Sequence, residues 1–218
     1  MTPQTIERQC NDCQLCCKLL PVRSPLLNKE SNTKCPHQKF SVGCLVYNSP
    51  RMPSECGLWN CRWLVNDDTA KLSRPDRSHV VIDLMPDFIV AQNNETGFKQ
   101  NLEVIQIWVD ARYPEAWRDP ELLSYLERRG VEGKAALIRY NAHDSFVLLP
   151  PALCSDNKFH DTRKEAGVTS QSLHRTHHAA EIMDALGDFK IRAIADANTT
   201  ITIGTLKMED ETDGKKAN

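Results

Sequence analysis

The cysteines are the residues whose types and spacing most clearly indicate chemistry. Thiolates at short, fixed spacings serve as metal ligands or as disulfide partners, and two intervening residues allow two sulfurs to converge on one ion. Eight of the nine cysteines fall within the first 61 residues: Cys10, Cys13, Cys16, Cys17, Cys35, Cys44, Cys56 and Cys61. This cluster predicts a metal centre, and disulfides are the alternative.

The spacing of the first thiols favours an iron–sulfur cluster, with Zn2+ as the alternative cofactor. Cys10-x2-Cys13-x2-Cys16 is similar to the three-thiolate tripod of such clusters, although no Cys-Pro follows three residues later as in bacterial ferredoxins. Zinc sites more often have two widely separated x2 pairs. Eight thiols allow either one site with spare cysteines or two four-ligand sites.

Some thiols are stronger ligand candidates than others. Adjacent Cys16 and Cys17 point in different directions in most backbone conformations, so we expect one to be a ligand and the other to serve a second site or to pack. The expected ligands are therefore Cys10, Cys13, Cys16 or Cys17, Cys44 and Cys56, with Cys35 and Cys61 as additional or second-site ligands. Cys154 follows an apolar stretch, and we expect it to be a buried structural thiol.

These motifs resemble the YkgJ-type cysteine-cluster family, which is described as a zinc- or iron-chelating domain. The resemblance covers residues 10–78 well, residues 79–150 loosely, and nothing beyond. It is carried by Cys10-Asn-Asp-Cys13-Gln-Leu-Cys16-Cys17, Gly43-Cys44-Leu-Val-Tyr47, Arg51-Met-Pro53-Ser-Glu-Cys56 and Cys61-Arg-Trp63-Leu64. The family typically has Tyr-x2-Arg-Pro-x2-Cys, whereas Tyr47 and Cys56 lie further apart here, so Cys61 is an alternative ligand to Cys56.

The resemblance implies a metal-binding protein with a structural, redox or metal-handling role. It also extends to flagellin lysine methylases, which implies a metal-dependent protein-modifying enzyme as one alternative; a zinc-stabilised interaction module is another. The sequence has no Gly-rich phosphate loop, no Gly-x-Ser-x-Gly elbow and no credible triad, so any enzymatic reactivity would belong to the metal centre.

Composition and charge limit the partners and the location that we expect. The net charge is -2, and the chain lacks a stripe of basic and aromatic residues, so we expect no nucleic acid. No apolar run approaches the length of a membrane span, so we expect no membrane. The first ten residues have neither a basic start nor an apolar stretch, which predicts a reducing cytoplasm, where thiols bind metal. An unknown protein partner is possible.

The elements that must position the thiols predict an α+β protein in two parts. Residues 1–66 form an irregular, turn-rich metal-binding module that bound metal would help to fold. Residues 67–78 are a connector to a small α/β sheet domain over residues 79–206, and the charged residues 207–218 predict a disordered tail.

Within this framework, periodicity and turn residues predict individual elements. Helices are expected over 13–20, from Asp119 to Gly130, and over 171–186. Strands are expected over 43–47 and 104–109, as a hairpin of 135–140 with 145–149, and as the pairs 79–84 with 88–91 and 189–195 with 200–203.

Charge and aromatic residues predict that the module docks on the sheet domain. Residues 1–74 carry 10 Lys and Arg against 6 Asp and Glu, a net charge of +4, which leaves -6 for the remainder. We expect Trp59 and Trp63 to be buried at the contact, and Arg74 and Arg77 to pair with carboxylates of the C-terminal part.

Overall fold

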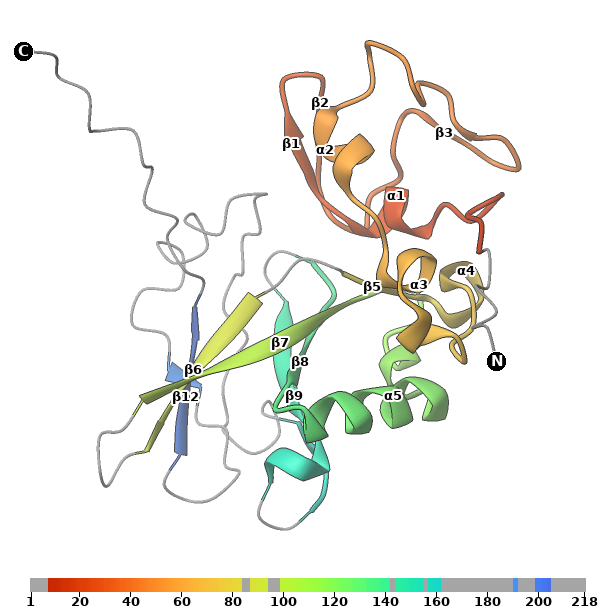
Figure 1. The fold of residues 1–218 in the computed structure, drawn as a ribbon. Helices are drawn as coiled ribbons and strands as arrows, with labels where there is room; N and C mark the ends of the chain where they lie inside the picture. Colours follow the sequence, from red (N-terminus) through yellow and green to blue (C-terminus); the bar gives the residue numbers. More distant parts are fainter. Residues whose placement is uncertain are drawn as a thin grey trace, which may run out of the picture.

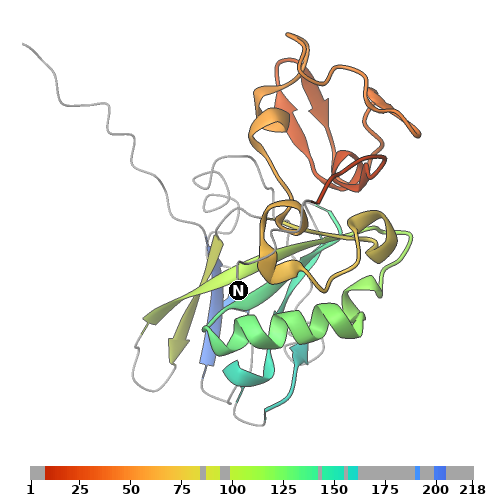
Figure 2. The same cartoon turned by 45° about the vertical axis from the view of Figure 1, so that its right-hand side comes forward.

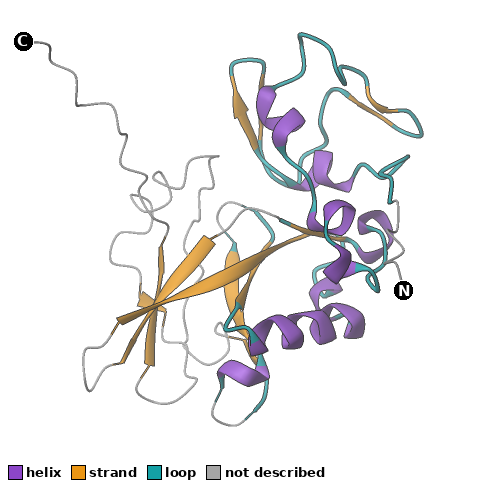
Figure 3. Ribbon diagram, in the orientation of Figure 1, coloured by secondary structure: helices purple, strands orange, loops and turns teal. Residues whose placement is uncertain are grey.

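The computed structural model describes residues 8–83, 87–93, 99–141, 144–154, 157–161, 190–191 and 199–204. These residues form helices and strands of an α+β protein, which confirms the fold class expected from the sequence. A mixed sheet with one long helix beside it makes up most of the structure, and a segment of short elements lies at one end (Figures 1 and 3). The expected helix over 171–186 and the expected tail over 207–218 lie outside the described residues.

The main sheet is built around one long strand, β7 (Lys99–Val109). Its strand order is β10-β9-β8-β7-β6-β12-β11, and every neighbouring pair is antiparallel except β7 and β8. The parallel pair is joined by a helical crossover, as parallel strands require. The other strands are β5 (Val80–Ile82), β6 (Asp87–Asn93), β8 (Ala135–Arg139), β9 (Ser145–Leu149), β10 (His160–Asp161), β11 (Lys190–Ile191) and β12 (Thr199–Gly204).

One predicted strand pairing is wrong. The pattern of residues 79–91 predicts that β5 and β6 pair with each other, but both pair with β7 and lie end to end along one side of it. The physical reason is the length of β7, which offers ladder partners to both strands. The Asp83 amide continues the ladder beyond β5 by donating to the Gln106 carbonyl at 2.9 Å. The predicted pairs β8–β9 and β11–β12 do form.

Helix α5 (Pro120–Val131) covers one face of the sheet and begins as its sequence predicts. The Asp119 carboxylate accepts hydrogen bonds from the Glu121 and Leu122 amides, and Pro120 occupies the first turn. The expected stop at Gly130 is wrong, because the helix continues through Val131. Gly130 instead allows α5 to pack closely against Pro150, because a Cβ at this position would lie 2.6 Å from the Pro150 Cβ.

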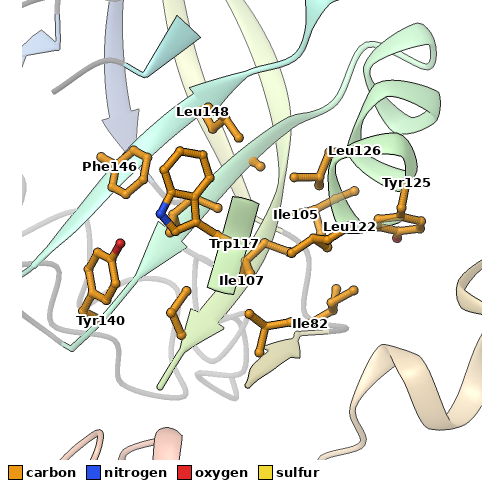
Figure 4. Close-up of a cluster of buried hydrophobic side chains, with 14 residues drawn as sticks. Ile82, Ile105, Ile107, Trp117, Leu122, Tyr125, Leu126, Tyr140, Phe146 and Leu148 are labelled. Atoms are coloured by element: carbon orange, nitrogen blue, oxygen red, sulfur yellow. The ribbon is translucent and has the colours of Figure 1, made fainter. Parts of the chain in front are cut away.

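Strand β5 and residues 104–109 of β7 are buried on both faces, which explains the mostly apolar run in that part of β7. Alternate residues point to opposite sides of a strand. Ile82 and Ile107 therefore join Trp117 and Tyr125 in the core between the sheet and α5, shown in Figure 4. Val81 and Trp108 alternate with these residues, point away from α5 and pack against α1; Trp108 is fully buried.

The N-terminal segment consists of short elements, and we call its residues 8–66 the cysteine module. In both Figure 1 and Figure 2, the module lies at the end of the sheet away from β6 and β12. It contains α1 (Leu15–Leu19), β1 (Val22–Ser24), β2 (Leu27–Lys29), β3 (Gln38–Lys39), β4 (Gly43–Cys44), α2 (Ser54–Leu58) and α3 (Arg62–Val65). The turns η1 (Asp67–Thr69) and α4 (Pro75–Ser78) connect it to β5; η2 (Ala116–Arg118) and η3 (Pro151–Leu153) flank α5 and β9.

The module contacts the sheet through apolar packing and a buried ion pair. Leu15 and Leu19 of α1 pack with Trp108 in a shared cluster. The Lys18 Nζ lies 2.5 Å from an Asp110 carboxylate oxygen, and Asp110 is fully buried at the end of β7. None of the helices described here is long and apolar enough to cross a membrane.

Only some of the residues that we expected between the module and the sheet lie there. Trp59 and Trp63 are half-buried and pack against the Trp108 cluster. The expected pairing of Arg74 with a carboxylate of the C-terminal part is wrong, because its guanidinium pairs with Asp12 and Asp76, close to the module. Arg77 likewise forms no ion pair with the residues that the structure describes. Lys18 forms the ion pair between the module and the sheet instead, because α1 places it beside Asp110 at the end of β7.

Candidate metal centre

All eight cysteines of the module line one cavity of about 560 Å³. They come from α1 and the turn before it, from β4 and α2, and from the loops between these elements. Cys154 is not among the lining residues; it is buried after β9, where its Sγ lies 3.9 Å from the Leu149 carbonyl oxygen. The structure therefore brings together every cysteine expected at the site and places Cys154 elsewhere.

Four of the lining thiols depend on the turn that leads into α1. The Cys13 amide donates to the Cys10 carbonyl at 2.7 Å, and Asn11 adopts a left-handed φ of 45° that asparagine tolerates. The next two, Cys16 and Cys17, are adjacent residues of α1, about 100° apart around its axis. They consequently face different neighbours.

Cys16 belongs to a group of thiols on the side of the cavity nearest the sheet. Cys13 and Cys16 pack against the cluster that contains Cys61 and Trp108. Cys61 is 6% exposed, and its backbone forms an isolated antiparallel bridge with Asp83. We call Cys10, Cys13, Cys16 and Cys61 the inner group.

Cys17 belongs to a second group, on the side formed by the β1–β2 hairpin. Cys17 and Cys56 pack against a small cluster of Val22, Leu27 and the buried Cys35. The neighbouring β3–β4 ladder adds the fourth thiol, Cys44, which pairs with Gln38. The backbone amide of Gln38 donates to the Cys35 carbonyl at 3.1 Å, so Cys44 lies near Cys35. We call Cys17, Cys35, Cys44 and Cys56 the outer group.

Burial and neighbouring charges shift the pKa of a thiol in each group. Burial raises the pKa of Cys61 to about 11, together with the nearby charges of Cys10 and Cys13. Burial likewise raises the pKa of Cys56 to about 11, together with the charges of three outer thiols: Cys17, Cys35 and Cys44.

The two groups meet at Cys16 and Cys17. A hydrogen bond between these side chains lowers the pKa of Cys17 and raises that of Cys16, and the ammonium of Lys29 also lowers the pKa of Cys17. Cys17 also lies close enough to Cys10 for its charge to raise the pKa of that thiol, after the larger effect of burial.

A buried ammonium lies beside the outer group. Lys29 is 4% exposed, and its Nζ donates to the carbonyls of Lys18, Glu30 and Thr33 at 3.0–3.1 Å. Burial lowers the pKa of Lys29, while nearby thiolates, that of Cys35 first, oppose this effect. A cation held here offsets negative charge on the outer thiolates.

A buried carboxylate lies at the inner end of the cavity. Asp83 is 3% exposed, and its oxygens accept hydrogen bonds from the indole nitrogens of Trp59 at 3.0 Å and Trp108 at 3.3 Å. Neither Lys29 nor Asp83 is among the expected site residues. One signal for Asp83 is its position directly after the apolar run of β5, where a charged residue requires partners.

The donor chemistry of the cavity fits a thiolate-bound metal centre. All nine cysteines lie in the described part of the chain, and none forms a disulfide. Among the described residues, however, no three or more Cys, His, Asp or Glu side chains lie close enough together to form a ready ligand set.

Comparison with protein-family models, with curated proteins and with solved structures finds no match to this chain. The resemblance to the YkgJ-type family therefore stays a prediction from the cysteine motifs.

Proposed function

We propose that this protein binds metal through the clustered cysteines and holds an iron–sulfur cluster, with zinc as the alternative. Its role would be structural, redox or metal handling. The observation that carries the proposal is that all eight cysteines of the module line one cavity, whereas Cys154 does not. These eight residues are spread over 52 positions of the chain from Cys10 to Cys61, so the fold itself brings them together.

The chemistry of the cavity wall supports this proposal. Thiolates select zinc, copper(I) and iron–sulfur clusters, whereas the oxygen ligands that magnesium and calcium require are few here. Burial keeps most of these thiols protonated, so a bound ion replaces protons on the sulfurs. The short elements of the module bury few side chains of their own, and bound metal would add folding free energy that packing does not supply.

Analysis of protein purified without oxygen tests the proposal. We expect a brown protein with broad visible absorption and matching amounts of iron and acid-labile sulfide per chain. A colourless protein with stoichiometric zinc would support the alternative cofactor. A protein that contains no metal, and takes up neither zinc nor iron with sulfide under reducing conditions, would contradict the proposal.

A further inference from the structure

We infer that the cavity holds two adjoining metal sites with four thiolate ligands each, an inner site and an outer site. This inference rests on the proposed metal-binding function and adds the number of sites and the ligands of each. The inner site uses Cys10, Cys13, Cys16 and Cys61; the outer site uses Cys17, Cys35, Cys44 and Cys56.

Packing separates the two groups. Cys13, Cys16 and Cys61 share one cluster with Trp108 of the sheet, whereas Cys17, Cys35 and Cys56 share another with the β1–β2 hairpin. The two clusters have no member in common. A single site made from both groups would have to draw thiols away from one of these two walls.

Backbone hydrogen bonds assign the two remaining thiols. The Cys13 amide donates to the Cys10 carbonyl, which keeps Cys10 beside the inner group. The β3–β4 ladder places Cys44 opposite Gln38, and the Gln38 amide closes a turn by donating to the carbonyl of Cys35 in the outer group. Each group therefore contains four thiols, which is the number of ligands in a structural zinc site or around a common iron–sulfur cluster.

The adjacent cysteines of α1 explain how two sites can share one cavity. Consecutive helical residues point about 100° apart, so Cys16 and Cys17 can contribute to different sites but rarely to the same ion. The contact between Cys16 and Cys17 makes the two sites neighbours.

The two sites differ in the charges beside them. The buried ammonium of Lys29 lies beside the outer group. The inner group instead has Asp83 in the wall of the cavity and the Asp76 charge near Cys13, together with the Arg74 guanidinium near Cys10. Four thiolates around a divalent ion leave a net charge of -2, which a nearby cation offsets and a carboxylate increases.

Paired substitutions test the division directly. The inner variant is Cys10→Ser with Cys61→Ser, the outer variant is Cys35→Ser with Cys56→Ser, and the mixed variant is Cys56→Ser with Cys61→Ser. Each removes two thiols, so only their distribution between the groups differs. Cys154→Ser is the matched control, because this thiol lies outside the cavity. Zinc, iron and sulfide per chain are measured after anaerobic purification and after loading with zinc alone.

We expect two zinc ions, or two clusters' worth of iron and sulfide, in the unmodified protein and in Cys154→Ser. The inner and outer variants should each keep half of that amount, and the mixed variant should keep less than either. One equivalent in the unmodified protein, or equal losses in all three paired variants, would overturn the two-site inference but leave the metal-binding proposal standing. No metal in any protein would overturn both.

A second measurement keeps the test valid if a variant folds poorly. Limited proteolysis should leave residues 99–141 protected in every variant that is scored. The outer variant is the more robust one, since Cys35 and Cys56 pack away from the sheet. Tryptophan fluorescence should respond to zinc in the outer variant and not in the inner variant, because the indoles of Trp59 and Trp108 meet at Asp83 at the inner end of the cavity. The reverse response would also overturn the assignment.

Discussion

At the scale of single residues, two buried charges of opposite sign determine the electrostatics of the cavity. Lys29 is held by three backbone carbonyls beside the outer thiols, and Asp83 is held by two indole N–H groups at the inner end. Both side chains are nearly inaccessible to water, so their charges are only weakly screened. Substitution of either should therefore affect the bound metal without removing a ligand.

Substitution of Lys29 tests this effect. Lys29→Gln removes the ammonium beside Cys35 and Cys56, and we expect it to weaken metal retention at the outer site by about 10- to 100-fold, as for other residues that support metal ligands. Competition with a chelator measures this affinity. Lys34→Gln is the matched control, because Lys34 is exposed next to Cys35. Equal affinities in the two variants would show that the buried charge does not act on the site.

The gathering of the eight cysteines around one cavity could be predicted from their spacing, because that spacing is a local property of the chain. Lys29 and Asp83 could not, since their importance depends on residues that the fold brings near them. The position of Lys29 in β2 gives no sign that its side chain turns inward between Lys18 and Thr33. The two indole partners of Asp83 are likewise 24 and 25 residues away along the chain.

At the scale of elements, the sheet is organised by a strand that packs on both faces. The apolar run of residues 104–109 predicts a buried strand, and β7 is one. Its pairing could not be predicted, because the length of β7 allows β5 and β6 to share one edge. The same two-sided burial brings Trp108 to the module while its neighbours in β7 pack beneath α5.

Gly130 provides a test of packing between α5 and the segment after β9. Gly130→Ala would place a Cβ 2.6 Å from the Pro150 Cβ, and the rigid proline ring cannot move aside easily. We expect a loss of about 1–3 kcal/mol in the free energy of unfolding, measured by denaturant titration.

Gly57→Ala is the matched control for Gly130→Ala. Gly57 lies in α2, and the atom nearest to its added Cβ would be Met52 Cε at 3.8 Å. Alanine favours a helix by up to about 1 kcal/mol over glycine, so this variant should be neutral or more stable. An equal loss in both variants would contradict the packing role of Gly130.

At the scale of the whole molecule, the module is attached to the sheet by the contact between α1 and the end of β7. Burial alone would raise the pKa of Asp110, but hydrogen bonds from Arg112 and Lys18 outweigh it and lower the pKa to about 2. Since this folded value lies below the ordinary value of 3.8, the ion pair stabilises the protein above pH 3.8. The contribution is lost as the pH falls toward 2.

The Lys18–Asp110 pair therefore predicts a specific dependence on pH. Lys18→Met should reduce the free energy of unfolding by about 1.5–3 kcal/mol at pH 6, because Asp110 loses a charged partner while it remains buried. The difference from the unmodified protein should shrink as the pH is lowered from 4 to 2, measured by denaturant titration at each pH. A difference that stays constant over this range would contradict the role of the ion pair.

The central claim is that the cavity thiols are metal ligands, and alkylation of Cys10 tests it most directly. Cys10 is exposed as a residue although its thiol is partly desolvated, so a reagent such as iodoacetamide can reach it when no metal is bound. We expect Cys10 to react slowly in protein purified anaerobically with its metal and rapidly after chelation, as followed by mass spectrometry of peptides. Equal, rapid alkylation of Cys10 before and after chelation would contradict the claim.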